Sequence, residues 1–465
     1  MPALSPTAYL MAINQTANPV TEVRGERILI LDSLRGIAVL GILLMNIPIF
    51  AYPRMVMFSP NLIDFTGLNF YAWYGVEWMV EGSQRALFSM LFGAGMLLFI
   101  SRQEDYTKGL LPAEYFFRRQ LWLLVFGFFN AYVLLWPGDI LYHYAIIGMV
   151  LFAFRRLQPK HLLAAALVCM LFQTLRENAD FYRSKLMVSR GEALARMDTS
   201  KTALTPLQKD RLSEYQQFKK AATKEAKTEM LKQIVGNVQG TYPQVYSQLS
   251  EISFRVETTG IFHFIFFDVL VFMFIGMAFY KNGILTGHAS VQWYWLLFLV
   301  GMGVGLTLSY LRLKPSLQYD FDEYAYTKNV VFEFYQLSRS FRSLGIFGGI
   351  MLLYKSGAFK WWFALMRPVG KMAFTNYLTQ SLICGLVFYG PGLGLYGKLQ
   401  FHQLYYVVAA IWVLQITWSH LWLRYYNMGP MEWLWRSLTY WKKQPVRKSD
   451  AARLSTPTSK EPAAV

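Results

Sequence analysis

The chain has 465 residues and a formal net charge of +17, from 45 Lys and Arg against 28 Asp and Glu. It is 54% hydrophobic and only 16% charged, whereas about 25% of the residues in a soluble domain are charged. Its two cysteines, Cys169 and Cys384, both lie within apolar stretches. This composition excludes a disordered chain and a disulfide scaffold. The placement of the basic residues decides whether the charge indicates nucleic acid binding or membrane topology.

Long apolar runs predict an all-α fold, a polytopic membrane helix bundle with about ten spanning helices, because each span needs about 20 mostly apolar residues. The predicted windows are 31–50, 82–100, 118–136, 139–156, 160–176, 259–280, 291–311, 329–354, 372–390 and 403–424. Residues 1–22 contain no basic segment, and Arg24 and Arg27 directly precede the first window. We therefore interpret this window as a retained helix and not as a signal peptide.

Basic residues concentrate in alternate connections between these windows, which is the positive-inside bias of membrane proteins. The connection between windows 7 and 8 is an exception, with Arg312, Lys314 and Lys328 on the side predicted to be outside. The bias predicts cytoplasmic N- and C-termini and a basic face that attracts anionic lipid headgroups. The lipid bilayer, and not nucleic acid, is then the natural partner of the positive charge. The oligomeric state stays open, and a homodimer is one of the states considered.

Five segments follow from this pattern. They are a cytoplasmic tail (1–25), a first membrane half (26–176), a polar insertion (177–256), a second membrane half (257–442) and a disordered basic cytoplasmic tail (443–465). The insertion is rich in Lys, Glu, Gln and Ala, which predicts solvated helices, and the topology places it outside the cytoplasm. It is a helical cap over that face, or alternatively a lid or a partner-docking element.

Charged residues at membrane depth are costly, so they face protein or water and often mark function. Asp32 and Arg35 are three residues apart near the start of the first window. They form either a structural ion pair or an anion site, in which Arg35 binds a phosphate and Gly36 permits close approach.

Asp139 and His143 are four residues apart and share a helix face. A carboxylate beside an imidazole can orient it as a general base. The alternative is an aspartate that caps the helix, next to an interfacial histidine.

Asp268 lies within the sixth window, and Arg339 and Arg342 lie within the eighth. Pairing between these helices would compensate the buried charges. The group is a structural ion pair, a polar cavity for an anionic or acyl-carrying substrate, or an ion path in a transporter. Glu77, Glu81 and Arg85, at intervals of four, predict a polar stripe that enters the membrane.

Asn376 and Gln380 share a face of the ninth window. Amides inside a bundle usually bond across helices, and a place in a substrate site is the alternative. No Cys/His spacing indicates a metal site, and no Walker loop or nucleophile elbow is present.

Several stretches resemble the bacterial YeiB-like inner-membrane proteins, a domain family of unknown function. They are RILILDSLRGIAVLGILLMNIPIF, LFSMLFGAG, GDILYHYAIIG, GKMAFTNYLTQSLICGLVFYGPGLGLYGKL and GPMEWLWRSLTY. The resemblance covers about residues 25–442 and implies a multi-pass protein of the bacterial inner membrane. The opening Asp-x-Leu-Arg-Gly also resembles the first helix of transmembrane acyltransferases such as heparan-α-glucosaminide N-acetyltransferase and the bacterial sugar O-acyltransferases.

The resemblance implies an acyl-CoA donor and an extracytoplasmic acceptor, with Asp32, Arg35 and Asn46 as shared fold or donor-site residues. Asn46 stands where the sugar O-acyltransferases carry a catalytic histidine. In the glucosaminide enzyme the histidine follows in the next loop, but residues 51–81 contain none here. The candidate catalytic residues are therefore His143 and Asp139.

Three functions remain as hypotheses: an acyltransferase, a transporter of a small or lipid-like solute, and a non-catalytic accessory protein. The candidate substrate and donor residues are Asp32, Arg35, Asn46, Arg85, Asp268, Arg339, Arg342, Asn376 and Gln380. Acyl-CoA is the expected donor substrate, and no other cofactor is expected.

Overall fold

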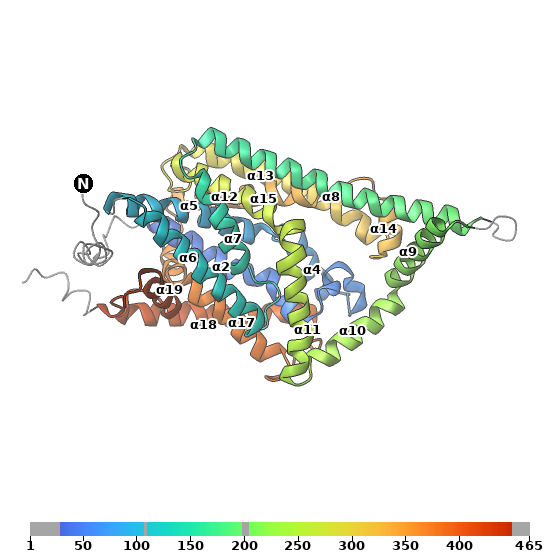
Figure 1. The fold of residues 1–465 in the computed structure, drawn as a ribbon. Coiled ribbons are helices and arrows are strands. Elements are labelled where there is room, and N and C mark those ends of the chain that lie inside the picture. Colours follow the sequence, from blue (N-terminus) through green and yellow to red (C-terminus); the bar gives the residue numbers. More distant parts are fainter. Residues whose placement is uncertain (1–27, 107–108, 198–203, 449–465) are drawn as a thin grey trace, which may run out of the picture.

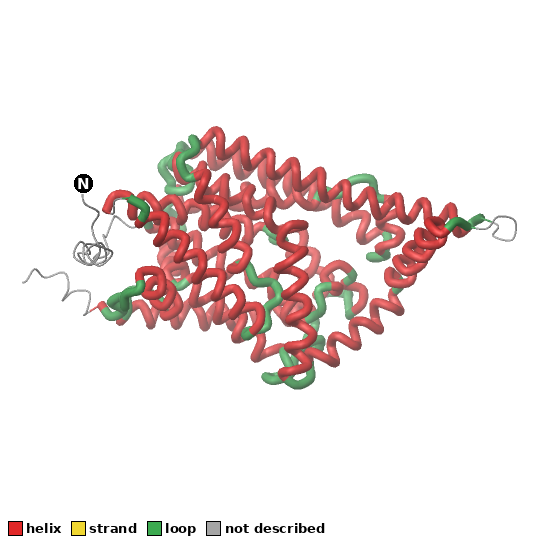
Figure 2. Tube along the Cα trace, viewed as in Figure 1, coloured by secondary structure: helices red, strands yellow, loops and turns green. Residues whose placement is uncertain are grey.

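The computed structural model describes residues 28–106, 109–197 and 204–448, and the predicted tail at 1–25 and most of the one at 443–465 lie outside these ranges. The described residues form helices joined by loops, with no strand among them (Figures 1 and 2). The predicted all-α class is confirmed.

Each of the predicted windows contains an α-helix. In chain order these are α2 (Leu29–Ala51), α5 (Ser83–Tyr106), α6 (Leu111–Tyr132), α7 (Leu141–Leu151), α8 (Pro159–Ala195), α12 (Phe266–Lys281), α13 (Val291–Gln318), α15 (Tyr335–Ser356), α17 (Ala373–Phe388) and α18 (Leu404–Tyr425). Shorter elements join them: α3 (Met55–Phe58), η1 (Pro60–Leu62), α4 (Leu68–Met79), η2 (Phe152–Phe154), the π-helical η3 (Val256–Ile265), α14 (Glu323–Asn329), α16 (Lys360–Lys371), η4 (Phe401–Gln403) and α19 (Pro430–Tyr440).

Five helical stretches of the described chain are long and apolar enough to cross a membrane: Leu29–Ala51, Leu68–Asp105, Pro159–Ala195, Val291–Gln318 and Phe401–Tyr425. A sixth is added if Tyr242–Ile261 and Phe266–Lys281, which meet at 65°, form one bent span. Several predicted spans fall short on length, since α7 has 11 residues and α17 has 16. The figure of ten spans therefore stays a prediction.

Large apolar side chains on the outside of the bundle remain exposed. Val168 and Leu175 on α8 are 65% and 70% exposed, Leu299 on α13 is 61% exposed and Val413 on α18 is 66% exposed. A soluble monomer rarely exposes such continuous apolar faces. Buried polar residues, including Asp268 and Arg339, lie inside the bundle. An apolar outer surface around a partly polar interior is the arrangement that a lipid environment requires.

The polar insertion is helical, as predicted. It consists of the end of α8, then α9 (Pro206–Ala222), α10 (Lys224–Val238) and α11 (Tyr242–Arg255). Threonines begin these helices: Thr205 and Thr241 form capping boxes, and the Thr223 hydroxyl accepts from Ala226 N. The arm leaves the bundle along α8 and returns through α11, at the end away from α19 (Figure 1). Helix α8 continues through residue 176 without a break, over about 55 Å at 1.5 Å per residue.

Helices α2 and α16 touch through their backbones. A Cβ atom at Gly36 would meet the carbonyl of Met366, and one at Gly370 would meet the carbonyl of Asp32. Gly36 thus permits close approach, as predicted, and the group that approaches is the α16 backbone. This packing brings Lys371 beside the start of α2, where it lines the cavity described next.

Candidate functional site

A cavity of about 890 Å³ lies within the bundle, between α2, α5, α6, α7, α17 and α19. Its volume is at the upper end of the range for small-molecule sites, about 300–1,000 Å³. Residues from both ends of the described chain, Ile28 and Lys448, line it. Along α5 it extends from Gln103 to Phe88, which is about 22 Å of helix.

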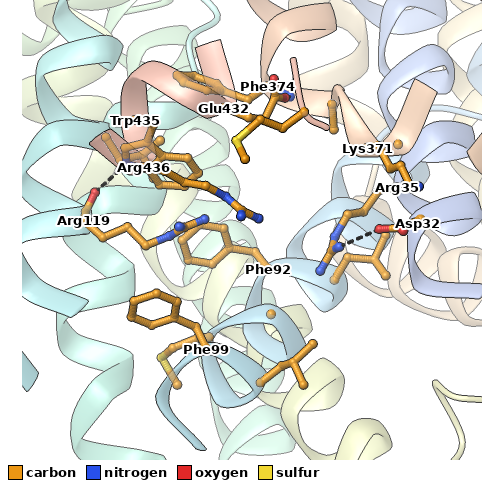
Figure 3. A pocket seen from close by; sticks show the side chains of 18 of the residues that line it. Asp32, Arg35, Phe92, Phe99, Arg119, Lys371, Phe374, Glu432, Trp435 and Arg436 are labelled. Carbon is orange, nitrogen blue, oxygen red and sulfur yellow. Dashed lines mark hydrogen bonds and ion pairs between the residues drawn. The ribbon is translucent and has the colours of Figure 1, made fainter. Parts of the chain in front are cut away.

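The mouth of the cavity, at the end where the described chain begins and finishes, is strongly basic. Seven cationic residues line the cavity: Arg35, Arg102, Arg119, Lys371, Arg436, Lys442 and Lys448. The acidic lining residues are two, Asp32 and Glu432. In Figure 3 the guanidinium groups of Arg35, Arg119 and Arg436 enter one shared space. Several converging cations of this kind suit a ligand with more than one negative charge.

Arg119 is held in place by aromatic rings. Its guanidinium carbon lies 3.6 Å from the centroid of the Trp435 ring and 5.1 Å from that of Phe99. The indole N–H of Trp435 donates to the backbone oxygen of Arg119 at 2.9 Å, as drawn in Figure 3. These contacts order the arginine before any ligand arrives, so less entropy is lost on binding.

Glu432 attaches α19 to the first turn of α17. Its carboxylate accepts from the backbone N–H groups of Phe374 at 2.7 Å and Thr375 at 3.0 Å, and from the Thr375 hydroxyl at 2.5 Å. A carboxylate at a helix N-terminus is favoured by the helix dipole. Burial raises the pKa of Glu432, while the hydrogen bonds from Thr375 lower it. The same helix α19 then places Trp435 and Arg436 at the cavity.

The inner part of the cavity is apolar and aromatic. It is lined by Phe88, Leu91, Phe92, Met96, Phe116, Leu123, Leu141, Tyr144 and Tyr377. Gln120 lies among them, 2% exposed, and its Oε1 has no hydrogen-bond partner within the described residues. A basic mouth that continues into an apolar interior fits an amphipathic ligand with an anionic head and an apolar tail.

The predicted pair at the start of α2 forms. Arg35 Nη1 lies 3.2 Å from Asp32 Oδ1, and both residues line the cavity. The ion pair and the anion site are therefore compatible, because the pair is part of the cavity wall. Asn46 lies about 16 Å further along α2 and does not line the cavity.

Asp139 and His143 are in contact, but the contact is between the imidazole and the Asp139 backbone and does not involve the carboxylate. The Asp139 carboxylate accepts from Asn130 at 2.7 Å, from Tyr142 N at 2.8 Å and from the Tyr377 hydroxyl at 3.4 Å. His143 Nδ1 instead contacts the backbone oxygen of Asp139 at 2.8 Å. The expected orientation of the imidazole by the carboxylate is wrong, because the carboxylate turns toward the start of α7 and caps it.

Asp268 pairs with Arg339, as predicted, and its second cation is Arg85 instead of Arg342. Arg339 Nη1 donates to Asp268 Oδ2 at 2.8 Å, and Arg85 Nη2 lies 3.1 Å from the same oxygen. Gln336 Nε2 donates to Oδ1 at 3.2 Å. Arg342 points away, one helical turn further along α15, and its guanidinium meets Glu81.

Arg342 is bound mainly by neutral oxygens. It donates to the Trp78 carbonyl at 2.9 Å and the Ser83 hydroxyl at 3.2 Å, and it also contacts the Ser309 hydroxyl. Since these acceptors lie where α4 ends, where α5 begins and on α13, the arginine joins three segments. Its environment is that of a structural residue.

The predicted stripe of Glu77, Glu81 and Arg85 is not continuous. Helix α4 ends at Met79 and α5 begins at Ser83, with Gly82 at a φ of 71° between them. This break sends the three side chains to different partners. Glu77 pairs with Arg312 at 2.9 Å, and Glu81 accepts from the Tyr335 hydroxyl at 2.9 Å.

Asn376 and Gln380 bond across helices. Asn376 Nδ2 donates to the Val369 carbonyl and to Ser419 Oγ, both at 3.1 Å. Gln380 Nε2 donates to the Val39 carbonyl and to Gln415 Oε1, both at 3.0 Å. Neither residue lines the cavity. Their amides therefore form hydrogen bonds between helices and do not belong to this site.

Sequence reasoning missed most of the cavity. Arg119, Lys371 and Arg436 are among the basic residues whose placement predicts only membrane topology, and none of the predicted sites includes Trp435, Tyr377 or Gln120. The available signal was the close spacing of Glu432, Trp435 and Arg436 in PMEWLWRSLTY. Within the described residues, no group of three or more His, Cys, Asp or Glu could hold a metal ion.

A helical bundle with an apolar outside and a polar interior defines the class: a multi-pass α-helical membrane protein. Residues 279–442 match the family described as "Protein of unknown function (DUF418)". The chain is 29% identical over 440 residues to "Uncharacterized protein YxaH" of Bacillus subtilis (strain 168), which covers 91% of this chain and 96% of the relative. It is 28% identical over 430 residues to "Uncharacterized protein YeiB" of Escherichia coli (strain K12). This match covers 89% of this chain and 96% of the relative.

The resemblance to the YeiB-like family is thereby confirmed. No solved structure matches the chain significantly.

Proposed function

We propose that the protein is an inner-membrane acyltransferase that takes an acyl group from a cytosolic acyl-CoA. The observation that carries the proposal is the cavity, whose basic mouth leads into an apolar interior. Acyl-CoA combines several phosphate charges with an apolar chain. The phosphates would lie among Arg35, Arg119 and Arg436, and the chain would extend toward Phe88 and Tyr377. The ends of the described chain, Ile28 and Lys448, line the cavity and would lie on the cytoplasmic side.

The reaction would take place near the inner end. An acceptor hydroxyl oxygen attacks the thioester carbonyl carbon, the new C–O bond forms and the C–S bond breaks. The hydroxyl proton passes to a base, and the CoA thiolate leaves and is protonated. Asp139 would accept this proton by way of the Tyr377 hydroxyl, which lies 3.4 Å from its Oδ1. His143, buried against two backbone oxygens, would position the start of α7.

Transport through the bundle is less well supported. Tyr144 lines the cavity, and its hydroxyl lies 2.6 Å from Ser89 Oγ and 3.3 Å from the carbonyl of Arg85. These contacts separate the cavity from the Asp268 cluster. Solute flux through the wild-type protein in liposomes, without any acyl-CoA binding, would favour the transporter.

Binding of octanoyl-CoA to purified protein in nanodiscs tests the proposal. Wild-type protein should bind, and Arg119→Gln with Arg436→Gln should weaken binding by at least tenfold, since a charged hydrogen bond contributes about 1.5–3 kcal/mol. Arg156→Gln is the matched control, because Arg156 is exposed and does not line the cavity. If wild-type protein fails to bind, or if the double variant binds equally well, the proposal is refuted.

A further inference from the structure

Gln120 is a polar side chain in the inner part of the cavity with an unused hydrogen-bond acceptor. It lies on α6, lines the cavity and is only 2% exposed, and its Oε1 has no hydrogen-bond partner among the described residues. An amide oxygen that is buried in apolar surroundings without a partner costs free energy. A ligand that brings an N–H group to this oxygen would remove that cost.

The two tyrosines of the inner part are already bonded. The Tyr144 hydroxyl lies 2.6 Å from Ser89 Oγ, and the Tyr377 hydroxyl donates to Asp139 Oδ1 at 3.4 Å. The remaining side chains listed above for this part of the cavity are apolar. Gln120 is therefore the inner side chain best placed to recognise a polar group in the ligand.

Gly148 of α7 leaves room for this amide and fixes its depth. A Cβ atom at Gly148 would lie 2.8 Å from Gln120 Oε1 and 3.1 Å from Phe92 Cε1, so the amide oxygen and the Phe92 ring lie close to one point. Phe92 is seven residues along α5 from Phe99, whose ring the Arg119 guanidinium contacts, and seven residues are about 10 Å of helix. The amide therefore lies deeper in the cavity than the Arg119 guanidinium.

The acyl-CoA of the proposed function carries suitable groups at this depth. The pantetheine arm, which joins the phosphates to the thioester, contains two amides. In an extended arm their nitrogens lie about 7 and 12 Å beyond the nearest phosphorus, at about 1.2 Å per bond. Each amide offers an N–H donor and a carbonyl acceptor, which are the counterparts of the groups on a glutamine side chain. With the phosphates at Arg119, one of these amides would reach Gln120.

We propose that Gln120 is a specificity-determining residue that binds an amide of the pantetheine arm, with its Oε1 accepting from the amide N–H. The inference rests on the proposed function, because it names the part of acyl-CoA that the cavity recognises. It adds a requirement that a basic mouth and an apolar interior do not impose. An anionic lipid with a plain alkyl chain leaves the Gln120 oxygen unpaired, so the cavity would select a pantetheine thioester over such a lipid.

The test combines a change in the ligand with a change in the protein, in full-length protein in nanodiscs. The ligands are octanoyl-CoA and two analogues, in each of which an ester oxygen replaces the N–H group of one pantetheine amide. The variant is Gln120→Met, which keeps the length of the side chain and removes its amide. Gln84→Met is the matched control, because Gln84 Oε1 also lacks a partner within the described residues and Gln84 does not line the cavity.

We expect Gln120→Met to bind octanoyl-CoA at least tenfold more weakly than wild type, because the ligand amide then faces an apolar wall without a partner. One ester analogue should bind wild-type protein at least tenfold more weakly than octanoyl-CoA does, and should lose nothing in Gln120→Met. Gln84→Met should bind all three ligands like wild type. Without ligand, Gln120→Met should unfold at the same or a higher temperature, whereas loss of a residue that only supports the fold would lower it.

Three results would overturn the inference: Gln120→Met binds octanoyl-CoA as tightly as wild type, both ester analogues bind wild-type protein as tightly as octanoyl-CoA, or each analogue loses the same factor in both proteins. The second result needs no variant, so it decides the outcome if Gln120→Met fails to fold. In all three cases binding of octanoyl-CoA to wild-type protein leaves the proposed function standing. If wild-type protein does not bind octanoyl-CoA, the proposed function fails and the inference fails with it.

Discussion

Gly95 offers a direct test of whether an acyl chain occupies the cavity. It lines the cavity on α5, seven residues from Phe88 and eight from Gln103, so it lies near the middle of the path. A Cβ atom at Gly95 would meet only Arg35 Nη2, at 3.4 Å. A leucine there would project into the cavity between the basic mouth and the apolar interior. Gly95→Leu should therefore obstruct the acyl chain, while Arg119 and Arg436 at the mouth stay available.

The magnitude follows from overpacking and helix propensity. Forcing a ligand past an added side chain costs about 1–3 kcal/mol, which corresponds to about 5- to 150-fold in Kd. The substitution also replaces glycine inside a helix, which stabilises the fold by about 0.8 kcal/mol. We thus expect a variant that unfolds at the same or a higher temperature and whose affinity for octanoyl-CoA falls by this factor, more than its affinity for CoA itself.

The assay compares octanoyl-CoA with CoA by equilibrium binding in nanodiscs. Gly303→Leu is the matched control, because nothing lies within 4 Å of a Cβ at Gly303 and this glycine is exposed on α13. It has the same gain in helix propensity and no effect on the cavity. Wild-type affinity of Gly95→Leu for octanoyl-CoA would show that the chain lies elsewhere, and the reasoning would fail.

Two further predictions concern stability. Asp268→Asn leaves Arg339 buried with an amide in place of its counter-charge, so the protein should lose about 3–5 kcal/mol and unfold at a lower temperature in scanning fluorimetry. Glu251→Gln, which removes an ion pair whose side chains are 61% and 73% exposed, should change little; equal unfolding temperatures for the two variants would contradict the argument. Glu432→Gln should weaken the cap on α17 by about 0.5–2 kcal/mol and loosen α19, seen as faster amide exchange over residues 430–440. Unchanged exchange there would show that α19 is held by other contacts.

The sequence by itself determined the helices and the membrane class, because apolar runs and charge placement are local properties of the chain. It also located the buried charges: Asp268 and Arg339 were expected to pair, and they do. Asp32 and Arg35, three residues apart on one helix, met for the same local reason.

Only the tertiary structure decided which distant groups meet. Arg85 took the place expected for Arg342 because the chain breaks at Gly82 and α5 packs along α12, a consequence of backbone contacts that no periodicity reports. The His143 imidazole contacts the backbone oxygen of Asp139, because the Asp139 carboxylate is occupied by Asn130 and by the backbone N–H of Tyr142 at the start of α7. The cavity joins Ile28 to Lys448, residues at opposite ends of the described chain, so its basic mouth exists only once α19 has packed against α17. The shape of the cavity and the contacts between residues distant in sequence depend on how the helices pack, and they decide where this protein can bind a ligand.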